Sequence, residues 1–146
     1  MKTLAEMLLA PHRHDAVVDD AVRLIETHVG SRSGLRGISL KTGLAMLKTA
    51  KPGILNRAVR RLLPEFLDAL EPFHAEFRRG TQRDFSRFLQ ERDARVTAAL
   101  LTVADTRVRQ ASPAVRSNYA RLRGTAEAEV GAVVPALGRL IDAYLE

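Results

Sequence analysis

The strongest constraint on the fold is a helical repeat of apolar residues in the segment 55–79. Apolar side chains recur there at intervals of three and four residues, the spacing of one face of an α-helix. They are Val59, Leu62, Leu63, Phe66, Leu70, Phe73 and Phe77. Pro64 and Pro72 lie inside this repeat, and proline removes a helical hydrogen bond, so we expect a kink or a break near each. The repeat predicts a central core helix.

Weaker repeats of the same kind cover most of the remaining chain. They predict helices over 4–9, 11–28, 39–50, 113–123 and 126–145, and over 81–110 either one helix or two that divide near Asp93. Gly124 is expected to separate the last two helices, and Pro135 to kink the last one. No stretch alternates apolar and polar residues as strands do. The 146 residues therefore predict one all-α domain, 1–146, a bundle of six to eight helices with proline-kinked core helices.

Positive charge is concentrated in the segment 27–64. The chain has 23 Lys and Arg against 17 Asp and Glu, a formal net charge of +6 and a pI near 10.5. Residues 27–64 contain no acid, and neither do residues 106–126, a second segment rich in Arg. If both segments share a face, they form a basic patch. If they pair with acids of the other segments, little net field remains.

The first of these segments is the candidate surface for an anionic partner. Its candidate residues are Arg36, Lys41, Lys48, Lys51, Arg57, Arg60 and Arg61. The leading hypothesis is a non-catalytic binding or scaffolding protein, with a protein or a nucleic acid as the expected kind of partner. Solvated Arg side chains on the outer faces of core helices would explain the same composition.

DNA binding is the first alternative, because residues 45–64 resemble the second half of a helix-turn-helix. Gly53 would stand in the turn, and the Arg residues that follow it would meet phosphates or base edges. The match fails before the turn, because Lys48 and Thr49 stand where the motif has apolar and small residues.

Two other kinds of ligand remain open. Residues 38–51 read as a short basic amphipathic helix, with Leu40, Leu44 and Leu47 on its apolar line, which is typical of helices that lie on anionic membranes. A pocket between kinked helices would suit a small-ligand carrier or an enzyme.

Catalytic and cofactor motifs are missing from the sequence. The absence of Cys excludes disulfides and thiolate sites and fits a cytoplasmic protein. No phosphate loop or nucleophile elbow occurs, and we expect His74 to pair with Glu71 and Arg78 rather than to act as a base. We therefore expect no enzyme and no catalytic, cofactor or metal site. No apolar run reaches the ~18–20 residues of a membrane helix, and no signal peptide is expected.

Several short segments along the chain resemble a bacterial family of uncharacterised small helical proteins. They are LAEMLLAP (4–11), DAVVDD (15–20), SGLRG (33–37), KPG (51–53), FLDALEP (66–72) and PALGRLI (135–141). The resemblance spans nearly the full length and implies a stand-alone cytosolic protein. It implies no activity and no site residue, because the family has no assigned function.

Overall fold

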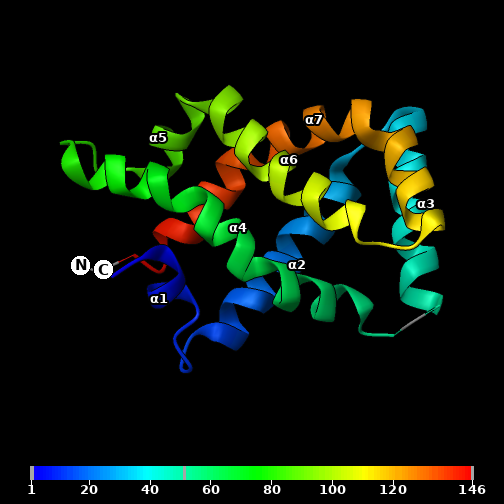
Figure 1. The fold of residues 1–146 in the computed structure, drawn as a ribbon, viewed down its shortest axis with the longest axis horizontal. Helices are drawn as coiled ribbons and strands as arrows, with labels where there is room; N and C mark the ends of the chain where they lie inside the picture. The colour runs from blue at the N-terminus through cyan, green and yellow to red at the C-terminus, as the bar shows by residue number, and fades with distance from the viewer. Residues whose placement is uncertain (1, 51, 146) are drawn as a thin grey trace.

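The fold is all-helical. The computed structural model describes residues 2–50 and 52–145, without the side chains of Arg36, Ser39, Leu47, Ala50, Asn118 and Leu122. This part of the chain forms seven α-helices and no strand: α1 (Leu4–Leu8), α2 (His14–Ser31), α3 (Gly34–Ala50), α4 (Ile54–Arg79), α5 (Phe85–Gln90), α6 (Asp93–Arg109) and α7 (Pro113–Asp142) (Figure 1). The predicted bundle of six to eight helices is confirmed.

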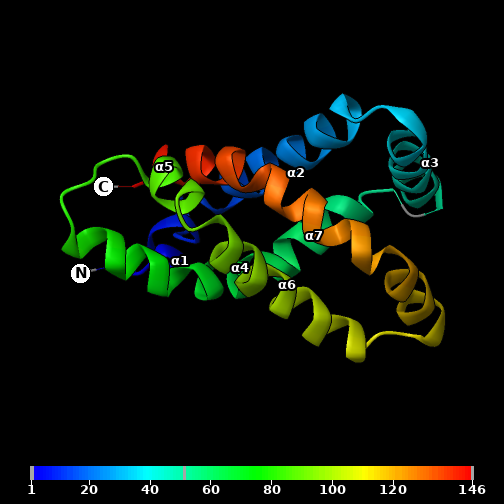
Figure 2. The same cartoon turned by 90° about the horizontal axis from the view of Figure 1, so that it is seen from above.

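Helices α4 and α7 hold the bundle together. Helix α4 packs against α1, α2 and α6, whereas α7 packs against α2, α5 and α6 and runs along most of the molecule (Figure 2). The buried residues of α4 include Leu63, Leu70 and Phe73 of the predicted core line. Leu67 is also buried, although it lies outside that line. None of the helices in the described residues is both long and apolar enough to cross a membrane.

Neither proline of α4 breaks the helix. Helix α4 continues through Pro64 and Pro72 and bends along its course (Figure 1). An interior proline costs about 3 kcal/mol. Burial of Leu63, Leu67 and Leu70 offsets this cost, because each buried leucine contributes about 1.5–3 kcal/mol.

The break predicted at Gly124 is wrong, because α7 is a single helix of 30 residues. Gly124 lies in its interior, where a glycine costs only about 1 kcal/mol relative to alanine. The predicted start is confirmed, since Ser112 caps the helix through its side chain and Pro113 occupies the first turn.

Helix α5 crosses α7 in very close contact at Gly138. A Cβ atom built on Gly138 would lie 2.5 Å from the Cα of Ser86. The Ser86 hydroxyl donates a hydrogen bond of 2.8 Å to the carbonyl of Pro135, and the Asp142 carboxylate accepts from the backbone N–H groups of Phe85 and Ser86. The first turn of α5 is therefore bonded directly to α7.

The segment 81–110 is divided into two helices, which settles the alternative left open by the sequence. The division falls at residues 91–92, between α5 and α6. Helix α5 begins at Phe85 rather than near Thr81, because Asp84 is its N-cap and accepts a hydrogen bond from the backbone N–H of Arg87.

Helix α3 begins at Gly34, five residues before its predicted start. Gly34 has a φ of 72°, which lets the chain turn sharply out of α2. Gly37 lies against the backbone of Arg32, where an added Cβ would lie 2.6 Å from the carbonyl carbon. Gly34 and Gly37 therefore allow a tight helix–helix corner in a segment where no helix was predicted.

Two glycines of α7 test this packing with opposite expected results. Gly138→Ala is expected to lower the free energy of unfolding by about 1–3 kcal/mol, because its Cβ meets the backbone of Ser86. Gly124→Ala is expected to raise it by up to about 1 kcal/mol, since nothing lies within 4 Å of its Cβ position. Denaturant unfolding followed by circular dichroism measures both. Equal effects of the two substitutions would contradict the close crossing.

Candidate functional site

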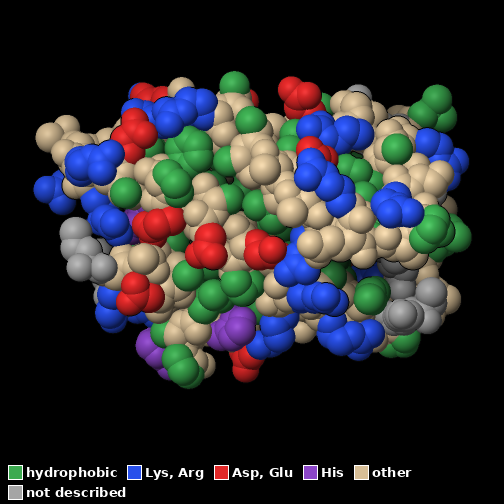
Figure 3. All heavy atoms as spheres, in the orientation of Figure 1, with side chains coloured by type: hydrophobic (Ala, Val, Ile, Leu, Met, Phe, Trp, Pro, Cys, Tyr) green, Lys and Arg blue, Asp and Glu red, His purple; other side chains and the backbone are tan. Residues whose placement is uncertain are grey.

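The two acid-free segments of the sequence lie at the same end of the molecule. Residues 27–64 supply α3 and the start of α4, and residues 106–126 supply the end of α6 and the start of α7. Figures 1 and 2 show these elements at the end opposite the two termini. In Figure 3, Lys and Arg lie beside hydrophobic side chains over this end, whereas the Asp and Glu of that face lie over the middle and the opposite half. We call it the basic end.

Helix α3 lies across the basic end (Figure 1). The described side chains of its outer face carry no charge. Leu35, Ile38 and Met46 are 86%, 62% and 68% exposed. Thr42, Ala45 and Thr49 share this face at helical spacing and are also exposed. Val115 at the start of α7 is 49% exposed. These four large hydrophobic side chains all belong to the acid-free segments.

The predicted cations have different surroundings. Lys48 forms an ion pair with Glu26 of α2, and Arg60 forms one of 2.8 Å with Asp15. Arg57 donates to the carbonyl of Pro52, but it is exposed. Lys41 and Arg61 are exposed and form no ion pair with the described residues.

The other two of the seven candidate residues are Lys51 and Arg36. Lys51 lies outside the described residues, and so does the side chain of Arg36. The structure therefore brings three exposed cations of the candidate set, Lys41, Arg57 and Arg61, to the basic end, and binds two others to acids of α2.

Sequence reasoning missed other residues at this end. Arg109 and Arg116 come from the second acid-free segment and are exposed. The positive charge of residues 106–126 was the available signal. Leu35 was missed because the predicted helix began after it, and Ile38 because only Leu40, Leu44 and Leu47 were placed on the apolar line. The expected apolar line of Leu40 and Leu44 faces inward instead and is partly buried.

Charged contacts fasten the helices of the basic end to one another. Glu129 of α7 accepts from His28 at 2.7 Å and from Arg32 at 3.1 Å, both near the end of α2. Asp105 of α6 accepts from Tyr119 and Arg123 of α7. The pKa of Asp105 is lowered, mainly by the hydrogen bond from the Tyr119 hydroxyl and then by the hydrogen bond from Arg123. Burial raises the pKa of Tyr119 to about 12. Asp105 therefore remains ionised and holds the two helices together.

The helix-turn-helix alternative concerns the residues on either side of Gly53, at the end of α3 and the start of α4. Gly53 has a φ of 77° and directly precedes α4, so the chain turns at the glycine where the motif has its turn. Lys48 and Thr49, which stand where the motif has buried residues, are exposed. Of the three arginines expected to reach DNA, Arg60 is bound to Asp15, whereas Arg57 and Arg61 are exposed.

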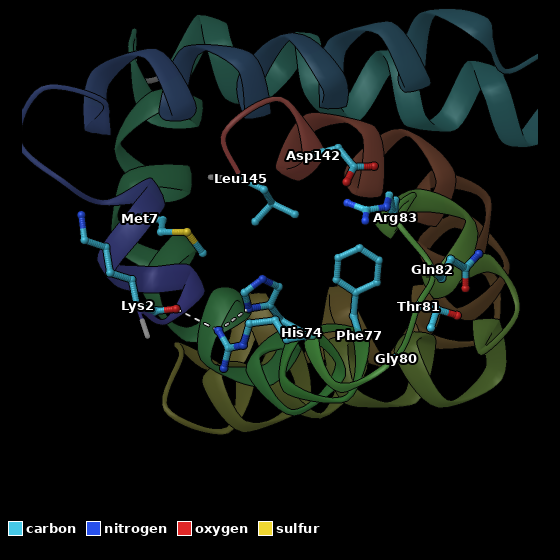
Figure 4. A pocket seen from close by; sticks show the side chains of 11 residues that line it. Lys2, Met7, His74, Phe77, Gly80, Thr81, Gln82, Arg83, Asp142 and Leu145 are labelled. Carbon is cyan, nitrogen blue, oxygen red and sulfur yellow. Dashed lines mark hydrogen bonds between the residues drawn. The ribbon is translucent and has the colours of Figure 1, made fainter.

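A hollow of about 800 Å³ lies at the opposite end of the molecule (Figure 4). It is formed by α1, the end of α4, the α4–α5 connection and the C-terminal residues. His74 lies in its wall and is only 3% exposed. Its Nδ1 atom lies 2.9 Å from Nη1 of Arg78 and 3.6 Å from a carboxylate oxygen of Glu71. The predicted pairing of His74 with Glu71 and Arg78 is confirmed.

The same contacts anchor the N-terminal residues to α4. The other carboxylate oxygen of Glu71 accepts from the backbone N–H of Leu4 at 2.7 Å, and Arg78 donates to the carbonyl of Lys2 at 2.9 Å. The pKa of His74 is lowered, mainly by burial and to a smaller extent by the Arg78 guanidinium, although Glu71 opposes this shift. No group of three or more potential metal ligands occurs among the described residues.

The fold places the chain in the class of small all-α bundle proteins. Residues 4–145 match the model of a family of unknown function, DUF6918, and the chain belongs to that family. The resemblance to an uncharacterised family is thereby confirmed. Neither a curated protein nor a solved structure matches the chain.

The lowered pKa of His74 predicts a loss of stability in mild acid. The unfolded chain binds a proton at His74 below about pH 6.5, whereas the ring in the folded protein takes up a proton only at a lower pH. The contribution of His74 to the free energy of unfolding is therefore fully present above pH 6.5 and is lost as the pH falls below this value. His74→Gln, which keeps an acceptor for Arg78, is expected to lose less stability than wild type between about pH 7 and pH 5.

Unfolding curves across this pH range measure the difference between the two proteins. If the free energy of unfolding of His74→Gln falls with pH as steeply as that of wild type, the lowered pKa of His74 is contradicted.

Proposed function

We propose that the protein is a non-catalytic binding protein that docks on an anionic membrane surface through its basic end. The outer face of α3 lies on the membrane interface, and the cations around it face the lipid headgroups. The observation that carries this proposal is the uncharged face of α3, with Leu35, Ile38 and Met46 exposed in a part of the chain that contains no acid.

Exposed large aliphatic side chains support an apolar contact. Soluble proteins expose isolated hydrophobic residues, but a group of them on one surface usually marks an interaction site. Here three such residues share one helix face, and the remaining residues of that face are Thr and Ala. Amphipathic helices that bind bilayers bury such a face at the boundary between headgroups and acyl chains.

The charge around α3 favours an anionic occupant. Lys41, Arg57 and Arg61 are exposed near α3, and Arg109 and Arg116 add to them from the neighbouring helices. A second copy of the chain would bring an equally basic surface to the contact, and like charges across an interface disfavour association. Anionic lipids would neutralise these cations while the bilayer interface accepts the aliphatic side chains.

A membrane also fits the side chains better than the nucleic acid considered above. Phosphate contacts need cations, but duplex DNA offers no surface for several exposed aliphatic residues except at thymine methyl groups. The broken helix-turn-helix pattern at Lys48 and Thr49 supports the same choice. Duplex DNA is therefore the less favoured partner.

Co-sedimentation with vesicles tests the proposal. We expect the protein to bind vesicles of phosphatidylcholine and phosphatidylglycerol in equal parts, but not vesicles of phosphatidylcholine alone. Arg57→Gln combined with Arg61→Gln is expected to weaken binding about 30-fold, because each cation near an anionic membrane contributes about 1 kcal/mol. Arg79→Gln combined with Arg87→Gln removes the same charge from exposed sites at the other end and should leave binding unchanged.

Two results would overturn the proposal. One is equal binding to neutral and mixed vesicles, and the other is no binding to mixed vesicles at about 0.1 M salt, where charges about 10 Å apart still interact. A gel shift with duplex DNA under the same conditions, without vesicle binding, would favour the nucleic-acid alternative.

The aliphatic residues of α3 give a separate prediction. Leu35→Ser combined with Ile38→Ser is expected to weaken vesicle binding about tenfold or more, because both side chains leave water at the interface. The thermal unfolding temperature should stay close to that of wild type, since both residues are exposed. Leu40→Ser, on the inner side of α3, should lower the unfolding temperature instead. Unchanged vesicle binding of the double variant would exclude α3 as the contact.

A further inference from the structure

The wall of the hollow beside His74 contains both apolar and polar side chains. Met7, Phe77 and Leu145 turn toward its interior from α1, α4 and the C-terminal residues (Figure 4). Arg83 reaches it from the α4–α5 connection, and His74 presents one edge of its ring to it (Figure 4). Its volume of about 800 Å³ lies within the usual range of small-molecule sites, roughly 300–1,000 Å³.

The hydrogen bonds around His74 define what its ring offers to a ligand. Arg78 has only N–H donors, so the Nδ1 atom at 2.9 Å must accept. The neutral ring therefore carries its proton on Nε2, and Nε2 has no hydrogen-bond partner among the described residues. A side chain that is 3% exposed thus directs one unused donor toward the hollow.

The remaining polar groups of the wall favour an anion. Arg83 is exposed and forms no ion pair with the described residues. Asp142 is the acid in the wall, and its two carboxylate oxygens already accept from the backbone N–H groups of Phe85 and Ser86. A planar guanidinium binds a carboxylate with two parallel hydrogen bonds.

We propose that this hollow binds a small monocarboxylic acid with an apolar body. The carboxylate is held by Arg83 and by the Nε2–H group of His74, and the apolar body lies against Met7, Phe77 and Leu145. The site lies at the end of the molecule opposite the basic end, and it does not depend on the membrane docking proposed above.

Titration of the ¹⁵N-labelled protein with octanoate, followed by NMR, tests this site. Saturable shifts are expected at the backbone amides of Phe77, Gly80 and Leu145, which line the hollow. The neutral 1-octanol, which has the same chain length, should bind at least about tenfold more weakly, because it cannot form the charged contact. Inorganic phosphate, which has no apolar body, should also bind more weakly than octanoate.

Two variants assign the binding to the named groups. Arg83→Gln is expected to weaken octanoate binding at least about tenfold and to leave 1-octanol binding unchanged. The matched control is Arg79→Gln, because Arg79 is also exposed but does not line the hollow. His74→Gln should weaken octanoate binding as well, and the exposed position of Arg83 keeps the test open if that variant is unstable.

The proposal is overturned by any of three results. They are the absence of saturable shifts, equal affinity for octanoate and 1-octanol, and octanoate binding that Arg83→Gln leaves unchanged. Phosphate affinity equal to that of octanoate would also overturn it, because the apolar wall would then have no part in binding.

Discussion

The close crossing of α5 over α7 is the contact on which the rest of the arrangement depends. At Gly138 the backbones approach so closely that no side chain fits between them, and Ser86 and Asp142 bond the first turn of α5 to α7 on either side of this point. The crossing thus depends on the absence of a Cβ atom at Gly138, on the hydrogen bond from the Ser86 hydroxyl to a carbonyl, and on the hydrogen bonds from two backbone N–H groups to the Asp142 carboxylate. Because α7 also packs against α2 and α6, this crossing joins α5 to the other core helices.

Chemistry is divided between the two ends that α7 connects. One end has exposed cations and an aliphatic helix face, and its helices are tied by Glu129 and Asp105. The other end has a hollow whose wall contains the nearly buried His74, fixed by Arg78 and Glu71. The net charge of +6 therefore does not give the local charge of either end, because the charged residues are unevenly distributed.

The helical content and most of the core could be predicted because they depend on local periodicity. Leu63, Leu70 and Phe73 were recognised from their spacing, and the start of a helix at Pro113 was also predicted. The failures concern glycine. Gly124 was expected to end a helix, but the local cost of a glycine is small compared with the packing of α7. Gly34 and Gly37 lay outside the predicted helices, whereas they allow a tight corner between α2 and α3.

The candidate surface was foreseen only in part, for a related reason. The absence of acids in 27–64 and 106–126 is visible in the sequence, but only the folded chain brings the segments together. Pairing of Arg60 with Asp15 and of Lys48 with Glu26 also depends on the packing of α2. The exposure of Leu35 and Ile38 could not be predicted, because the corner at Gly37 decides which side of α3 faces inward. The hollow beside His74 depends on residues from both ends of the chain.

The length of α7 has a consequence for access. A helix of 30 residues at a rise of 1.5 Å per residue is about 45 Å long, and it runs from the basic end toward the hollow. A molecule that lies on a bilayer through α3 would thus stand upright, with its far end held beyond the headgroup layer in bulk water. A solute could enter and leave the hollow while the protein remains on the membrane, so membrane docking and ligand binding in the hollow would not exclude each other.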